Sequence, residues 1–175
     1  MINKILLAFD GSENAERALD FAAEMAAKLD ADLMITHVLM HGRPSEELRR
    51  MSSVESIVAH AKETRDPDLT IAGSGGYDFF ASSNDPAGAQ RVITFVGEQL
   101  IAHAKDRAEA LGARVTQTNI GSGDFADEIM DAADAYSADM IVVGSRGLGP
   151  LRGAVLGSVS QKVLHYADQA VLAVK

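Results

Sequence analysis

The chain has 175 residues, with 25 acidic and 16 basic side chains, a formal net charge of -9, and no cysteine or tryptophan. A chain of this length buries roughly 70% of its unfolded surface on folding, so it closes a core without disulfides or a structural metal. Because cysteine is absent, disulfide scaffolds, thiolate zinc sites, iron–sulfur clusters and cysteine nucleophiles are excluded. The acidic balance argues against a nucleic-acid partner, since such binding needs clustered Lys and Arg side chains.

No segment of the sequence predicts export or membrane insertion. The first apolar run, residues 5–9, is shorter than a signal-peptide core and is followed by Asp10. The other apolar runs fall far short of the roughly 18 residues that a membrane-spanning helix needs. We therefore expect a cytoplasmic protein with one domain over residues 1–175.

Short apolar runs alternate with segments of helical periodicity along the chain. The runs predict five buried strands, at residues 5–9, 33–38, 115–120, 140–143 and 171–174. The periodic segments predict helices at residues 15–29 after a cap at Ser12, at 92–111 before Gly112, at 125–136 and at 159–167. This alternation joins parallel strands by right-handed crossovers, which predicts an α/β fold with a doubly wound parallel sheet and helices on both faces.

Residues 42–90 interrupt the alternation before a long helix that is expected to begin near Arg91. Residues 45–65 have a pattern compatible with a helix, whereas residues 73–88 are rich in Gly, Ser, Asn and Asp. That composition is typical of a mobile segment. We expect an extended, mobile insertion without a second core, and the sequence leaves open whether it covers a pocket or binds a partner.

A long glycine-rich segment follows the fourth predicted strand, at the edge where ligands bind in sheets of this class. Connections of this kind usually take about 2 to 6 residues, so a longer one is typical of a functional loop. Its glycines allow backbone N–H groups to approach an anion, and the helix that follows adds unpaired amides and a positive dipole end. The segment therefore predicts a phosphate site, with hydroxyls from Ser158 and Ser160 and cations from Arg146 and Arg152. Alternatively, the glycines serve tight turns and close packing, with Ser158 as an ordinary helix cap.

The spacing of four residues in this segment resembles the ATP-binding signature of the universal stress protein family. Gly144 and Gly147 are separated by two residues, and nine more residues precede Gly157 and Ser158. Other segments resemble the family as well, namely the opening strand with its Asp-Gly-Ser ending at residues 10–12, the second-strand terminus His37-Val38, and the closing strand at residues 171–174. Two departures are Gln169-Ala170, where the family often has Cys-Pro, and an insertion longer than usual.

The resemblance implies a Rossmann-like sheet of order 3-2-1-4-5 and a nucleotide site at its carboxyl edge. Asp10 would be directed at base or ribose, Val38 would face adenine, and Asp10 and Gly144 would flank one crevice. The nucleotide-binding residues implied in this way are Ala8, Phe9, Asp10, Val38, Gly144, Arg146, Gly147, Gly157, Ser158, Val159 and Ser160. The ligand would be ATP, AMP or ADP. A Mg²⁺ ion could accompany the phosphates, without ligands from protein side chains.

The resemblance also implies a homodimer, because a closing strand at a sheet edge would pair with a second copy. The predicted interface residues are Val171, Leu172, Ala173 and Val174.

Several other motifs have simpler interpretations. Residues 74–78, Ser-Gly-Gly-Tyr-Asp, resemble a pyrophosphate motif but lie inside the insertion, and no Gly-Lys-Ser or Gly-Lys-Thr occurs. His37 and His41 lack further ligands for a metal site, so His37 is interpreted as a strand-end residue beside the adenine pocket. Asp10-Gly11 could simply initiate a turn. The acids of residues 124–131 are interpreted as a solvated helix front that complements the helix dipole.

Three functions remain open at this stage. The first is an ATP-binding regulatory module of the stress response, in which nucleotide binding alters the dimer or the affinity for a client protein. The second is a slow ATPase or nucleotidyl transferase, although the loop offers no phosphate-binding lysine, water-orienting residue or magnesium carboxylates, so no catalytic residue is predicted. The third is a nucleotide-free interaction scaffold.

Overall fold

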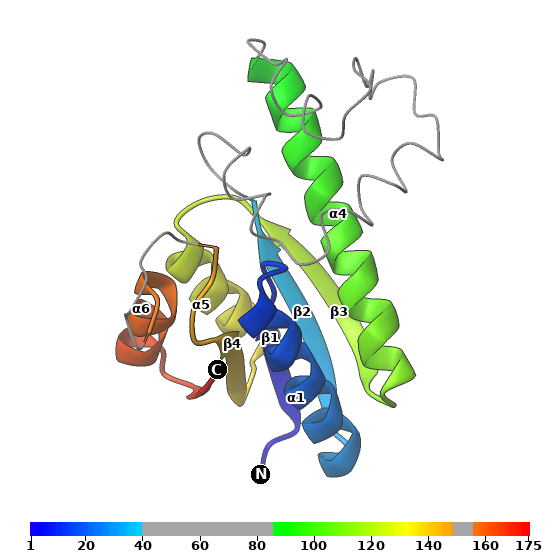
Figure 1. The fold of residues 1–175 in the computed structure, drawn as a ribbon. Coiled ribbons are helices and arrows are strands. Elements are labelled where there is room, and N and C mark those ends of the chain that lie inside the picture. Colours follow the sequence, from blue (N-terminus) through cyan, green and yellow to red (C-terminus); the bar gives the residue numbers. More distant parts are fainter. Residues whose placement is uncertain (40–85, 149–155) are drawn as a thin grey trace.

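Five parallel strands form the centre of the structure (Figure 1). The computed structural model describes residues 1–39, 86–148 and 156–175. The strands are β1 (Lys4–Ala8), β2 (Asp32–Val38), β3 (Arg114–Gly121), β4 (Met140–Gly144) and β5 (Ala170–Val174), and they lie in the order β3-β2-β1-β4-β5. All four neighbouring pairs are parallel. The predicted doubly wound sheet and its strand order are confirmed.

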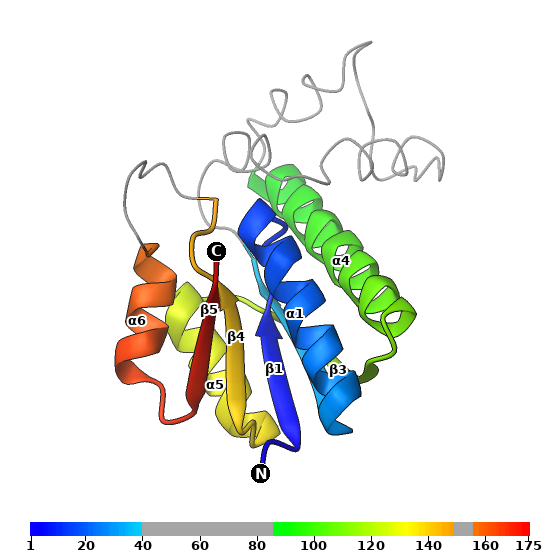
Figure 2. The same ribbon diagram turned by 60° about the horizontal axis from the view of Figure 1, so that its bottom comes forward.

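Helices cover both faces of the sheet (Figure 2). On one face lie α1 (Glu13–Leu29) and α4 (Pro86–Ala110), and on the other lie α5 (Phe125–Tyr136) and α6 (Ser158–Tyr166). Because strand side chains alternate between faces, each strand feeds two separate cores. Ile5, Leu7 and Ile35 pack with α1 and α4, whereas Leu6 and Ile141 pack with α5 and α6.

The two edge strands are less buried than the sequence predicted. Four of the eight residues of β3 form the polar run Thr116–Asn119, and most of its side chains are exposed or half-buried. The register between β2 and β3 shifts between Leu33 and Met34, an irregularity that is common at sheet edges. In β5 only Val174 is fully buried. The prediction of five buried strands is therefore wrong for the edges, since an edge strand has a neighbour on only one side.

The helix boundaries follow local chemistry. The predicted cap at Ser12 is confirmed, because its hydroxyl oxygen accepts a hydrogen bond from the Ala15 amide at 3.2 Å. The start predicted for α4 near Arg91 is wrong, because the helix already begins at Pro86. Proline suits a first helical position, where its missing N–H leaves no bond unmade, but hydrophobic periodicity does not reveal it.

Residues 40–85 lie outside the described residues, and they include most of the predicted insertion, its possible helix at 45–65, the motif at 74–78 and His41. None of the helices in the described ranges combines the length and apolar character required to cross a membrane.

Candidate functional site

The carboxyl ends of β1 and β4 lie side by side, with Ala8 opposite Val143 in the parallel ladder. This is the point where strand order reverses, since the chain runs outward from β1 to β2 and from β4 to β5. The residues that follow these two strands therefore meet at one edge of the sheet. Gly147 lies so close to the Asp10 carboxylate that a side chain at position 147 would overlap its Oδ2 atom.

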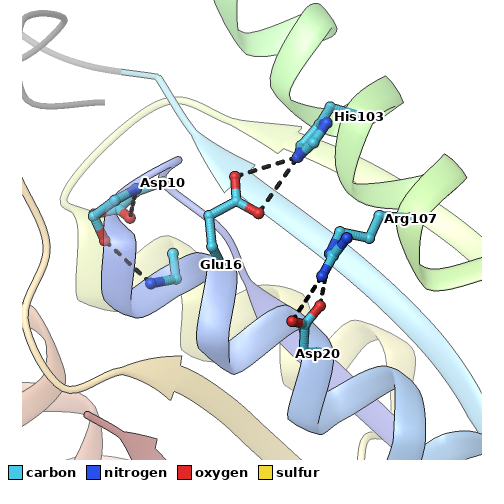
Figure 3. Close-up of polar contacts among 7 residues, drawn as sticks. Asp10, Glu16, Asp20, His103 and Arg107 are labelled. Atoms are coloured by element: carbon cyan, nitrogen blue, oxygen red, sulfur yellow. Dashed lines mark hydrogen bonds and ion pairs between the residues drawn. The ribbon is translucent and has the colours of Figure 1, made fainter. Parts of the chain in front are cut away.

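Asp10 forms a tight turn between β1 and α1 (Figure 3). Its Oδ1 atom accepts a hydrogen bond from the Ser12 amide at 3.0 Å, and Gly11 between them has a φ of 74°. The turn-forming interpretation of Asp10 is therefore confirmed. It leaves Oδ2 on the side of Gly147, so the turn also sets the direction in which the carboxylate points.

Ser145, which is completely buried, joins four segments of the chain. Its amide donates to the carbonyl oxygen of Val174 at the end of β5, and its own carbonyl accepts from the Gly157 amide at 2.7 Å. Its hydroxyl oxygen accepts from the Asn14 side-chain amide at 3.3 Å. The glycine-rich loop is thus closed at its base, where Ser145 and Gly157 meet.

The first turn of α6 presents amides that the helix itself does not use. Gly157 is the N-cap residue, and the first intrahelical bond is from the Gln161 amide to the Gly157 carbonyl. The amides of Ser158, Val159 and Ser160 therefore have no partner within the helix. No side chain of the described residues caps this turn. The interpretation of Ser158 as the helix cap is wrong, because that place belongs to Gly157 and Ser158 is exposed.

Two of the predicted site residues, Gly144 and Ser160, make contacts that stabilise the fold. The Ser160 hydroxyl donates to the Gly144 carbonyl at 2.7 Å, and its residue is only 4% exposed. Gly144 packs against the start of α1, where an added Cβ would lie 2.9 Å from the Ala15 amide nitrogen. Hence Gly144 and Ser160 have structural reasons for their identity whatever the loop binds.

The predicted base-binding residues also have structural roles. The side chains of Phe9 and Val38 are buried in opposite cores, and Ala8 is half-buried. These three residues can therefore border a ligand only along their backbone, not through the side chains of Phe9 and Val38. Arg146 is exposed, whereas Arg152 lies outside the described residues.

Sequence reasoning missed the ion pairs that link the helices around the site. On the face of α1 and α4, Glu16 contacts His103 at 3.2 Å and Asp20 binds Arg107 with two hydrogen bonds of 2.7 and 2.8 Å (Figure 3). The hydrogen bonds that Arg107 donates to Asp20, followed by the charge of Asp20, raise the pKa of the Arg107 guanidinium. Pairs between distant segments leave no periodic signal in the sequence.

The acidic start of α5 is more than a solvated helix front. Asp124 caps the helix by accepting hydrogen bonds from the amides of Ala126 and Asp127. Lys162 of α6 contacts the carboxylates of Asp124 at 3.0 Å and Asp127 at 2.8 Å. The hydrogen bond from Lys162 is the main cause that lowers the pKa of Asp124, and the two carboxylates raise the pKa of Lys162. The cation of α6 is thus engaged with α5.

In the parts of the chain that the structure describes, no three His, Asp or Glu side chains come together in a group that could hold a metal ion. The described residues include two open grooves. One, of about 540 Å³, runs along α6 and includes Ser158 and Lys162. The other, of about 570 Å³, runs between α1 and β5 and includes Phe21, Met25 and Leu172.

Comparison with known proteins decides the family. The family model described as "Universal stress protein family" matches residues 1–175. The chain belongs to this family. Universal stress protein YxiE of Bacillus subtilis (strain 168) is 31% identical over 175 residues, which cover 100% of both chains.

Solved structures of other universal stress proteins share the fold. One from Archaeoglobus fulgidus, in complex with dAMP, is 22% identical, has a TM-score of 0.56, and matches over 100% of this chain and 98% of that chain. A universal stress protein family protein from Arabidopsis thaliana, with AMP bound, is 18% identical, has a TM-score of 0.58, and matches over 99% of this chain and 91% of that chain.

Proposed function

We propose that this universal stress protein binds an adenine nucleotide, with ATP as the principal ligand, across the carboxyl ends of β1 and β4. The observation that carries the proposal is the first turn of α6, whose amides lack a side-chain cap in the described chain. Three amides that have no partner within the helix, at the positive end of its dipole, are suited to phosphate oxygens. The bound dAMP and AMP of the two solved relatives support an adenine nucleotide as the ligand.

The phosphates would lie on the amides of Ser158, Val159 and Ser160, beside Gly157 and Gly147. Ser158 would add its exposed hydroxyl, whereas Ser160 would contribute its amide alone, because its hydroxyl is bonded to the Gly144 carbonyl. Arg146, exposed next to Gly147, supplies a cation beside the phosphates in a chain whose net charge is -9. A Mg²⁺ ion would then be held by the phosphates and water.

The base and ribose would lie on the other side of Gly147. The Oδ2 atom of Asp10, which lies against Gly147, would accept a hydrogen bond from a ribose hydroxyl. Backbone groups of Ala8, Phe9 and Val38 would border the base. This assignment keeps Phe9 and Val38 in the cores in which their side chains are buried.

The role that suits this site is regulatory. Hydrolysis of ATP commonly uses a lysine that binds the phosphates. Lys162, the lysine of α6, is instead paired with Asp124 and Asp127. Retention of intact nucleotide therefore fits better than turnover, with the bound state read by a partner in the stress response. The client protein and the cytoplasmic location stay predictions.

A second copy of the chain is the partner that the edge of the sheet favours. In the described sheet β5 has a neighbour on one side only. The groove beside it is lined by the apolar residues Phe21, Met25, Leu172, Ala173 and Val174 and, in addition, by Glu24, Lys28 and Lys175. Phe21 is 57% exposed although it is a large apolar side chain. Pairing of two β5 strands would satisfy the open backbone groups and cover this apolar surface.

The nucleotide proposal is tested by releasing whatever the purified protein carries. Denatured protein is removed, and the supernatant is analysed by anion-exchange chromatography beside ATP, ADP and AMP standards. Calorimetric titration of nucleotide-free protein with ATP follows. We expect an adenine nucleotide in the first experiment and saturable heat in the second. Absence of nucleotide together with no binding at millimolar ATP would refute the proposal, and steady release of ADP would favour the ATPase alternative.

A further inference from the structure

The backbone of Phe9 is held on both sides by β2. Its amide donates to the Thr36 carbonyl at 2.9 Å, which extends the β1–β2 ladder by one residue. Its carbonyl, however, is bonded to a side chain, since the Nδ1 atom of His37 lies 2.8 Å from the Phe9 oxygen. The peptide that leads into Asp10 is therefore fixed by an imidazole ring.

The chemistry of this bond sets the state of the ring. A carbonyl oxygen only accepts, so Nδ1 carries the proton and donates it. Nε2 then has a bare lone pair, and it finds no partner among the described residues. Burial is the main cause that lowers the pKa of His37. The ring is thus neutral, with one tautomer selected by Phe9.

The packing around the ring keeps it in place. His37 is 2% exposed and lies under α4 at Gly97. A Cβ at position 97 would lie 3.1 Å from the ring atom Cδ2 of His37 and 2.8 Å from a methyl group of Leu39. Glycine is unfavourable inside a helix, so its presence here allows α4 to approach the ring closely.

We propose that His37 is a positioning residue of the nucleotide site, which fixes the Phe9 carbonyl so that the Asp10 carboxylate is presented against Gly147. The proposal rests on the proposed nucleotide function. His37 itself does not touch the ligand, because the ring is enclosed by α4 and Leu39. It acts through Asp10, which follows Phe9 in the chain and whose carboxylate accepts from the Ser12 amide, because the position of the Phe9 peptide sets where Asp10 begins.

Two substitutions separate the hydrogen bond from the packing. His37→Phe keeps a ring of similar size and removes the donor, whereas His37→Asn keeps an N–H group at the same distance from the backbone as Nδ1. We expect His37→Phe to weaken ATP binding in calorimetry by about fivefold to tenfold, which lies within the range of one net hydrogen bond. His37→Asn should retain affinity within about twofold of wild type. His165→Gln, on the exposed side of α6, is the matched control and should bind as wild type.

A double-mutant cycle with Asp10→Ala distinguishes positioning from a structural role. If His37 acts through Asp10, His37→Phe should cost less than about twofold in affinity once Asp10 is removed. An equal cost in both backgrounds would show that His37 only supports the fold and would overturn the proposal. Wild-type affinity in the His37→Phe single variant would overturn it as well. Failure of wild type and His165→Gln to bind ATP at all would instead refute the proposed function.

A second measurement needs no substitution in the core. Nitrogen NMR of the imidazoles in the wild-type protein should show His37 as the neutral tautomer with the proton on Nδ1, and that signal should shift when AMP is added. A proton on Nε2, or a signal that AMP leaves unchanged at saturation, would contradict the proposal even if His37→Phe fails to fold.

Discussion

The amide of Gly157 donates a hydrogen bond to the carbonyl oxygen of Ser145 across a distance of 2.7 Å. The amide of the same Ser145 donates to Val174, the last residue of β5. Two backbone hydrogen bonds therefore connect the N-cap of α6 to the edge strand of the sheet. A ligand that shifts Gly157 would act on β5 by this route, which is shorter than the covalent path through α6.

The two serines at the start of α6 should respond differently to alanine. Ser160→Ala removes the donor to the Gly144 carbonyl and leaves that oxygen without this partner, so we expect a loss of about 1–2 kcal/mol in the free energy of unfolding. Ser158→Ala removes an exposed hydroxyl, so stability should stay within about 0.5 kcal/mol of wild type while ATP affinity falls. Urea unfolding and calorimetry on the same preparations measure both quantities. Equal destabilisation by the two variants would contradict the assignment.

Alanine at the two glycines Gly144 and Gly147 should also have different effects, one on stability and the other on ATP affinity. In Gly144→Ala the new Cβ meets the backbone of α1, which cannot give way locally, so we expect destabilisation of about 1–3 kcal/mol. In Gly147→Ala the Cβ meets the end of the Asp10 side chain, which can rotate aside. Gly147→Ala should therefore unfold nearly as wild type but bind ATP more weakly. Thermal unfolding and calorimetry check the pair, and wild-type ATP affinity in Gly147→Ala would exclude Asp10 from the site.

The sequence predicts those parts of this structure that depend on local patterns. Strand and helix alternation, the Ser12 cap and the place of Asp10 and Gly157 at one edge of the sheet all follow from periodicity, spacing and family resemblance. The exposure of β3 was missed, because a run such as Val115 to Ile120 does not reveal that it has one neighbour. The bond between His37 and Phe9 was missed as well, because it joins residues 28 positions apart through a buried side chain.

Oligomeric state provides a test of the groove beside β5. Phe21→Asp places a charge on an apolar surface that a second copy would cover, without disturbing a buried side chain, so we expect a shift from dimer to monomer at micromolar concentration. Leu111→Asp, another exposed apolar residue but just beyond α4, is the control and should remain dimeric. Sedimentation velocity measures the change. A monomeric wild-type protein would refute the proposed dimer, and a dimeric Phe21→Asp variant would place the interface elsewhere.

The buried His37 should make stability fall in mildly acidic solution. Its pKa is lowered in the folded protein from an ordinary value of 6.5, because burial disfavours the charged ring. Once the pH falls below this ordinary value, the His37 ring therefore binds a proton in the unfolded chain but stays neutral in the folded chain. Stability supplied by His37 is complete above that pH and is lost as the pH falls toward the folded pKa, with a slope of at most about 1.4 kcal/mol per pH unit.

This loss is distinguishable from that of the carboxylates. The pKa of Asp124 is lowered mainly by Lys162, and that of Asp139 by the amides of Asn3 and Lys4. Their contributions are present above an ordinary value of 3.8 and are lost only in stronger acid. Urea unfolding at several pH values between about 5 and about 7 measures how the free energy of unfolding changes with pH. This change should be steeper for wild type than for His37→Phe, whose side chain has no proton to bind. Parallel slopes would mean that the ring binds its proton equally in both states, and burial would then not control its charge.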